Sequence, residues 1–156
     1  MSEVTLVDVP TQLVLGMQKK GRYAETPSVI GEIVRYAMAN GAQFAGMPVA
    51  LMHEPGREAA MQADRDGTAV IDVAFPIAKP VPSGEQVKCY ELAGGRMAKV
   101  VHKGPYDACG SAYGTLFEWL ATQGLRVTGF PREVCLNDPR TVRPEDIQIE
   151  IYAPVD

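Results

Sequence analysis

The stretch Lys20-Gly21-Arg22-Tyr23 recurs 83 positions further along the chain as Lys103-Gly104-Pro105-Tyr106. Other residues match at the same offset: Ser28 with Ser111, Gly41 with Gly124, Gly46 with Gly129, and Pro48 with Pro131. With a shorter second loop, Asp72–Ile77 then matches Glu150–Val155. Self-similarity at a fixed period is the signature of a repeated structural unit. We therefore interpret the chain as a tandem duplication.

Each half is predicted to fold as strand, helix, strand, strand. Leu13–Gln18 and Met97–His102 are short apolar runs typical of strands. Apolar residues then recur at helical spacing, as Val29, Ile30, Ile33, Val34 and Ala37 in the first half and as Ala112, Tyr113, Leu116, Phe117 and Leu120 in the second. Because a glycine in the left-handed conformation commonly ends a helix, Gly41 and Gly124 predict where the two helices stop.

The repeat also predicts the domain organisation. Two extended segments, Val4–Val9 and Gln86–Leu92, precede the two units and are expected to widen the sheet of each. We predict an α+β fold in which the two modules are related by pseudo-twofold symmetry and their antiparallel sheets form a ligand groove. The predicted boundaries are residues 1–156 for a single domain, about 3–77 for module one, 78–84 for a Pro-rich linker, and about 85–156 for module two.

Composition narrows the class of protein. Apolar residues make up 46% of the 156 residues and charged residues 22%, the balance of an ordinary globular chain. The net charge of −4 and the absence of a basic stripe argue against nucleic-acid binding, which relies on basic residues that neutralise phosphates. The uncharged stretch Tyr36–His53 is too short and too polar to span a membrane. Residues 1–5 lack the features of a secretory signal, so we expect a cytoplasmic location.

The cysteines and histidines give no reason to expect a metal or a cofactor. Cys89, Cys109 and Cys135 are an odd number without Cys-x-x-Cys spacing, which indicates neither a disulfide framework nor a zinc site. We expect the thiols to be small core groups, and only Cys135 has a position that could line a groove. His53 and His102 fall in separate predicted strands without ligand spacing and are expected at surface or boundary positions.

Strand parity predicts which side chains are left for a ligand, since successive side chains of a strand point to opposite faces. The isoleucines of the last strand share one face, which we expect to pack under a helix. The opposite face is then predicted to carry Glu133, Cys135, Glu150 and Tyr152 in the second half, with Ala50, Met52, Asp72 and Ala74 at the matching positions of the first. Two such sheets would form a groove with carboxylates and aromatic rings on its walls.

Several of these residues allow more than one role. Glu133 is either a solvated carboxylate on a half-exposed strand or the carboxylate at the floor of an aromatic pocket. Tyr113 lies on the apolar helix stripe and fits a core role as well as a pocket role. Trp119 and Tyr36 are equivalent in the repeat, and a structural role is at least as well supported for both.

The second half carries a recognisable pattern, and its elements are Gly104-Pro105-Tyr106, Tyr113, Leu116, Trp119-Leu120, Gly124-Leu125, Gly129, Pro131-Arg132-Glu133, Leu136-Asn137-Asp138-Pro139 and Ile149–Val155. This pattern resembles the GyrI-like small-molecule-binding family, which is similar to the effector-binding domains of AraC-type and MerR-type multidrug-responsive regulators. The resemblance is strong over residues 97–155 and weak in the first half. It implies a pair of strand-helix-strand-strand (SHS2) modules, in agreement with the repeat.

The resemblance also implies a function. Such domains bind amphipathic, often cationic, aromatic compounds, with a central glutamate that corresponds to Glu133 and with aromatic rings that stack on the ligand. The residues expected to bind ligand are Glu133, Tyr152, Tyr113, Tyr106, Trp119, Tyr23, Tyr36, Cys135 and Met52. Because the duplicated unit fills the sequence, the resemblance implies a standalone binder without a DNA-binding domain.

Three hypotheses remain open at this point. The first is a binding module that sequesters drugs or metabolites, or that inhibits a partner protein such as gyrase, a partner for which the sequence itself offers no support. The second is a hydrolase of cyclopropane-type electrophiles, with Glu133 as general base and Tyr152 or Tyr106 as hydrogen-bond donor. The third, haem binding, is less favoured because neither histidine is expected on the groove face.

Overall fold

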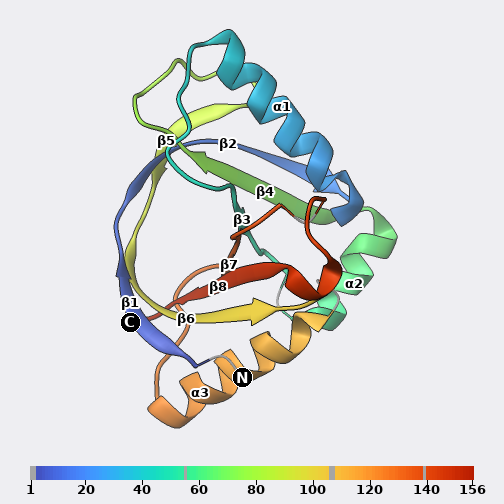
Figure 1. Cartoon of the computed structure of the whole chain (residues 1–156), viewed down its shortest axis with the longest axis vertical. Coiled ribbons are helices and arrows are strands. Elements are labelled where there is room, and N and C mark those ends of the chain that lie inside the picture. Colours follow the sequence, from blue (N-terminus) through green and yellow to red (C-terminus); the bar gives the residue numbers. More distant parts are fainter. Residues whose placement is uncertain (1–2, 55, 106–107, 139) are drawn as a thin grey trace. The chain divides into compact units, whose positions relative to one another are not determined.

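Antiparallel strands and a covering helix recur in both halves of the chain (Figure 1). The computed structural model describes residues 3–54, 56–105, 108–138 and 140–156. The strands are β1 (Thr5–Val9), β2 (Gln12–Gly21), β3 (Val49–Leu51), β4 (Ala69–Pro76), β5 (Lys88–Leu92), β6 (Gly95–Lys103), β7 (Arg132–Cys135) and β8 (Gln148–Pro154). The helices are α1 (Thr26–Ala39), α2 (Arg57–Asp66) and α3 (Gly110–Gln123), with short 3-10 turns η1 (Tyr23–Glu25) and η3 (Pro144–Asp146).

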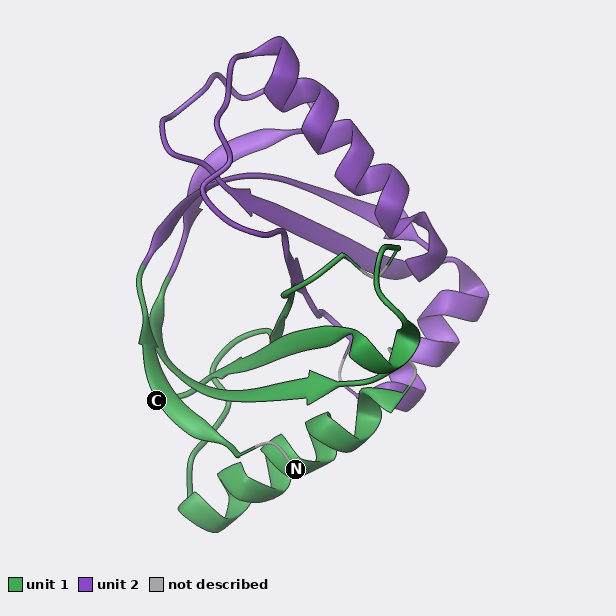
Figure 2. Ribbon diagram, viewed as in Figure 1, with its two compact units in different colours: residues 1–10, 94–156 green, residues 11–93 purple. Residues whose placement is uncertain are grey.

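The chain divides into two compact units with the same strand order (Figure 2). Unit 1 comprises residues 1–10 and 94–156, and its antiparallel strands follow the order β1-β6-β8-β7. Unit 2 comprises residues 11–93, and its strands follow the corresponding order β5-β2-β4-β3. The structure therefore confirms the predicted α+β fold with a duplicated antiparallel module.

The edge strands are exchanged between the two sequence halves. β1, from the first half, pairs with β6, with Thr5 opposite Lys99 and Val9 opposite Gly95. β5, from the second half, pairs with β2. The extended segments do widen the sheets, but each joins the sheet of the other half. The connections at residues 10–11 and 93–94 lack the Asn-Gly or Asp-Gly pair that a tight hairpin favours.

Each unit buries one apolar face of its sheet under its helix. In unit 2, Val29, Ile33 and Ala37 of α1 pack with alternate residues of β2 and β4, including Val73. In unit 1, the buried α3 residues Ala112, Leu116 and Leu120 pack against Ile149, Ile151 and Ala153 of β8. The predicted helical stripes are thus confirmed, except that Phe117 remains 42% exposed.

Turn contacts repeat in detail between the units. A Cβ atom placed on Gly46 would lie 3.3 Å from Pro76, and one on Gly129 would lie 3.4 Å from Pro154. Isolated β-bridges also correspond, joining Phe44 to Ile77 and Val127 to Val155. The chain leaves α1 through Gly41 (φ 70°) and α3 through Gly124 (φ 65°), as predicted for helix ends.

Helix α2 is the element that the sequence pattern did not predict. It is rich in charged and polar residues, buries none of them in the described structure, and ends at Gly67 in the left-handed conformation (φ 70°). It lies in the longer loop of the first half, between β3 and β4.

In the part of the chain that the structure describes, no helix combines the length and the apolar character needed to cross a membrane.

Ile33 and Leu116 occupy equivalent positions in the two helices and are both fully buried. We expect Ile33→Ala and Leu116→Ala each to lower the free energy of unfolding by about 2–5 kcal/mol, because each leaves a cavity in a packed core. Met38→Ala is the matched control, since Met38 on α1 is 77% exposed. Urea denaturation checks this; a loss for Met38→Ala as large as for Ile33→Ala would contradict it.

Candidate functional site

The register between β7 and β8 decides which side chains surround Glu133. Glu133 lies opposite Ile151, and Cys135 lies opposite Ile149. Residues directly opposite each other in a ladder share one face of the sheet. Glu133 and Cys135 therefore lie on the face that α3 covers, and the prediction that they share a face with Tyr152 is wrong.

Glu133 forms a buried pair with a tyrosine of α3. Glu133 is only 7% exposed, and its Oε2 accepts a hydrogen bond from the Tyr113 hydroxyl. Burial of a carboxylate is costly unless hydrogen bonds satisfy it, so this contact explains how Glu133 is tolerated beneath a helix. Tyr113 in turn stacks on Phe117, with ring centroids 6.2 Å apart. The half-exposed Phe117 thus connects the buried pair to the surface.

Two thiols lie within the electrostatic reach of Glu133. Burial raises the pKa of Cys109 to about 12, and the charge of Glu133 adds to the increase. Burial, followed by the charge of Glu133, also raises the pKa of Cys135. Both thiols are therefore protonated at neutral pH and are poor nucleophiles. Both belong to the core as expected from the sequence, but the proximity of Cys109 to Glu133 had no sequence signal.

Tyr152 belongs to a different network, on the sheet face away from α3. Its hydroxyl donates to Glu150 Oε1 at 2.9 Å, and Lys99 Nζ lies 2.6 Å from Glu150 Oε2. Lys99 also lies 5.8 Å from the centroid of the Tyr152 ring. Burial, then the hydrogen bond to Glu150, raises the pKa of Tyr152 to about 12. Tyr152 is thus a neutral phenol held beside an ion pair.

The other predicted aromatic residues are distributed over both units. In unit 2, the Tyr23 hydroxyl donates a hydrogen bond to Glu54. The Tyr36 hydroxyl donates to the carbonyl of Pro82, so Tyr36 contacts the predicted linker. Met52, also in unit 2, is half-buried just after β3. Trp119 is half-buried against the same core cluster as Tyr113. Tyr106 lies outside the described residues.

Both histidines have defined roles that sequence reasoning missed. His102 lies in β6, is only 8% exposed and makes a 3.0 Å hydrogen bond to the Pro105 carbonyl. His53 follows β3, and its Nε2 lies 2.7 Å from Asp72 Oδ2. Neither pairing follows a recognised motif. Among the described residues, no group of three or more His, Cys, Asp or Glu side chains is arranged to hold a metal ion.

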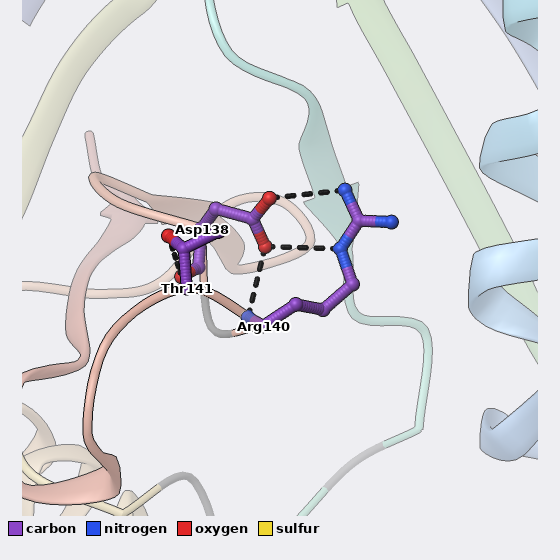
Figure 3. A network of polar contacts seen from close by, with 3 residues as sticks. All are labelled: Asp138, Arg140 and Thr141. Carbon is purple, nitrogen blue, oxygen red and sulfur yellow. Dashed lines mark hydrogen bonds and ion pairs between the residues drawn. The ribbon is translucent and has the colours of Figure 1, made fainter.

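The turn after β7 is held by Asp138 (Figure 3). Its carboxylate accepts two hydrogen bonds from the Arg140 guanidinium, at 3.1 and 3.0 Å, and one from the Arg140 backbone at 2.9 Å. These contacts lower the pKa of Asp138. Thr141 closes the same turn by donating to the Asp138 carbonyl at 3.1 Å. The Arg140 side chain of this turn is 88% exposed.

The sequence of the chain matches the profile of the GyrI-like small molecule binding domain over residues 2–156. The chain belongs to the GyrI-like family. No curated protein matches its sequence. As a GyrI-like domain, the protein is a small-molecule-binding module, and its fold agrees with that of solved structures.

The GyrI-like domain is similar to the C-terminal domain of EcmrR, with a TM-score of 0.82 and 19% identity over 100% of this chain and 98% of that one. The match to the EcmrR chain in a complex with DNA covers 99% of this chain but only 57% of that one, with a TM-score of 0.84 and 19% identity.

A hydrolase from Listeria innocua matches with a TM-score of 0.64 and 16% identity, over 99% of this chain and 92% of that one. SAV2435 bound to tetraphenylphosphonium matches with a TM-score of 0.59 and 11% identity, over 99% and 94%. At these identities the likeness establishes the fold.

The neighbourhood of Glu133 makes a prediction about Cys135. In a Cys89→Ser, Cys109→Ala background, which leaves Cys135 as the remaining thiol, we expect Glu133→Gln to shift alkylation by iodoacetamide to lower pH. The neutral amide no longer opposes formation of the thiolate, although burial still does. Glu118→Gln, on the exposed side of α3, is the control. An unchanged pH profile of alkylation in the Glu133 variant would contradict an effect of the Glu133 charge on the Cys135 thiol.

Proposed function

We propose that this GyrI-like domain binds lipophilic aromatic cations and that Glu133 supplies the carboxylate that recognises their charge. The observation that carries the proposal is the buried Glu133–Tyr113 pair beneath α3. A carboxylate kept at 7% exposure among isoleucines, leucines and thiols contributes little to folding on its own. Such a group is typical of a functional site.

The surroundings of Glu133 suit an aromatic cation. The rings of Tyr113 and Phe117 stack with an interplanar angle of 25°, and Trp119 lies on the same helix. Aromatic faces attract cations and accept flat apolar rings without requiring one ligand shape. Phe117 is 42% exposed, which gives a ligand an apolar approach from the surface. Charge recognition by Glu133 and stacking on Tyr113 would then act together.

The structural neighbours support the same ligand class. SAV2435 has been solved with tetraphenylphosphonium, a cation enclosed by aromatic rings, on a fold that this chain shares. The proposal assigns the corresponding chemistry to residues of this chain by their own contacts. It places Tyr152 outside the cation site, because Tyr152 is engaged by Glu150 on the other face of the sheet.

Fluorescence anisotropy with rhodamine 6G tests the proposal. We expect saturable binding to the wild type and a loss of about 2–5 kcal/mol of binding free energy in Glu133→Gln, since one partner of a buried charge pair is removed. Glu118→Gln on the exposed side of α3 should bind like the wild type. Equal binding by the Glu133 variant would place the cation site elsewhere, and no binding by the wild type would reject this ligand.

A second candidate function, hydrolysis of cyclopropane-type electrophiles, is favoured by the pairing of a carboxylate with a phenol. Glu133 would take a proton from water, whose oxygen attacks a ring carbon. As the strained carbon–carbon bond breaks, its electron pair moves to a conjugated carbonyl oxygen that accepts a proton from Tyr113. The proton held by Glu133 then restores the phenol. The hydrolase from Listeria innocua with a similar fold supports this candidate.

Turnover separates the two candidates. If the domain is a hydrolase, a spirocyclopropyl dienone should gain one water molecule per turnover, as measured by mass spectrometry. Glu133→Gln should abolish turnover, and Tyr113→Phe should reduce it by about a hundredfold, the scale of losing one oxyanion donor. Tyr36→Phe is the control, because its hydroxyl contacts the Pro82 carbonyl. Stoichiometric binding without product would exclude hydrolysis of that compound.

A further inference from the structure

A second buried carboxylate lies in unit 2, on the sheet face away from α1. Asp72 alternates along β4 with Val73, which packs in the α1 core, and is in register with Gln18 of β2. Its side chain is 5% exposed. Oδ2 accepts a hydrogen bond from Gln18 at 3.1 Å and lies 2.7 Å from His53 Nε2. Within the described residues, the buried Oδ1 accepts no hydrogen bond.

The duplication shows what satisfies a carboxylate at this position. Asp72 corresponds in the repeat to Glu150 of unit 1. There, Lys99 Nζ lies 2.6 Å from Glu150, and the Tyr152 hydroxyl donates to the other carboxylate oxygen. Both sheets therefore carry a carboxylate on the same strand and on the same face. In unit 1 an ammonium group from the protein binds it.

Unit 2 keeps the carboxylate but lacks the lysine and the tyrosine. Lys99, opposite Tyr152 in unit 1, corresponds to Gly16, opposite Ala74 in unit 2. Lys88, opposite Gly16 on β5, donates to the Gly84 carbonyl at 2.5 Å. The lysine that binds Glu150 in unit 1 is thus replaced by a glycine, Gly16, at the corresponding strand position of unit 2.

We propose that Asp72 is the recognition point of a second small-molecule site, which takes the primary ammonium group of a ligand in the place that Lys99 holds in unit 1. An ammonium offers three donors and a positive charge, and Asp72 Oδ1 is the acceptor. Gln18 is exposed, and the His53 side chain is 18% exposed, so the carboxylate is approached past these two groups.

Tyr90 of β5 lies on the same sheet face as Asp72. A Cβ atom on Gly16 would lie 2.7 Å from the Tyr90 hydroxyl, so the tyrosine packs directly over the glycine. The site therefore combines a carboxylate, an imidazole and a phenol ring, all contributed by unit 2. It differs in chemistry from the Glu133 site, where the proposed ligand is a lipophilic aromatic cation and not a primary ammonium group. The second site does not rest on the function proposed for Glu133.

The test uses two probes that differ in hydrogen-bonding capacity and not in charge. Dansylcadaverine carries a primary ammonium, and its N,N,N-trimethyl analogue carries a quaternary one. We expect the wild type to bind the primary ammonium more tightly. Asp72→Asn should weaken binding of dansylcadaverine on the order of ten- to a hundredfold, the scale of a hydrogen bond to a charged group, and should affect the trimethyl analogue less. Changes in dansyl fluorescence measure both affinities.

Controls make the outcomes distinct. Asp66→Asn on the exposed face of α2 should bind both probes like the wild type. His53→Gln, which keeps Asp72, should retain the preference for the primary ammonium. Equal affinities for the two probes, unchanged binding in Asp72→Asn, or no binding by the wild type would each overturn the second site. A rhodamine 6G titration of the same variants reports separately on Glu133.

Discussion

The pairing of β7 with β8 places the carboxylate of Glu133 on the buried face of the sheet. Glu133 lies opposite Ile151, within the layer that α3 covers. A desolvated carboxylate in that layer needs a donor, and Tyr113 on α3 provides one. The same pairing brings the charge of Glu133 near two thiols, where it adds to the burial that raises the pKa of Cys109 and Cys135.

The duplication has diverged most in its buried polar groups. Ile33 and Leu116 are fully buried apolar residues at equivalent positions, and the glycine–proline contacts at Gly46 and Gly129 are nearly the same. Conversely, Glu133 corresponds to Ala50, which is in register with Val73 and carries no polar group. A repeated scaffold with different polar groups allows each copy to recognise a different ligand chemistry, because packing sets the fold while a few buried charges set specificity.

The sequence predicted the elements that depend on local pattern. The helical stripes ending at Gly41 and Gly124 are encoded by neighbouring residues, and they were confirmed. The face of Glu133 was mispredicted because Val134 and Leu136, which alternate with it, form the more apolar face and were expected to pack under the helix. A strand face is decided by non-local pairing, and an error of one residue moves every side chain to the other side. The contact between His53 and Asp72, 19 residues apart, has no local signal either.

Because the edge strands are exchanged, each sheet is built from both halves of the sequence. β1 completes the sheet that contains β6, and β5 completes the sheet that contains β2. A fragment cut within residues 78–84 would therefore carry one edge strand without its partner and one sheet without its edge. Exposed strand edges favour aggregation. The two halves are thus repeats in sequence but not independent folding units, and substitutions in either half act on a sheet that both halves build. This dependence explains how the polar groups could diverge while the strand order stayed the same, because the edge strands hold each sheet to the other half of the sequence.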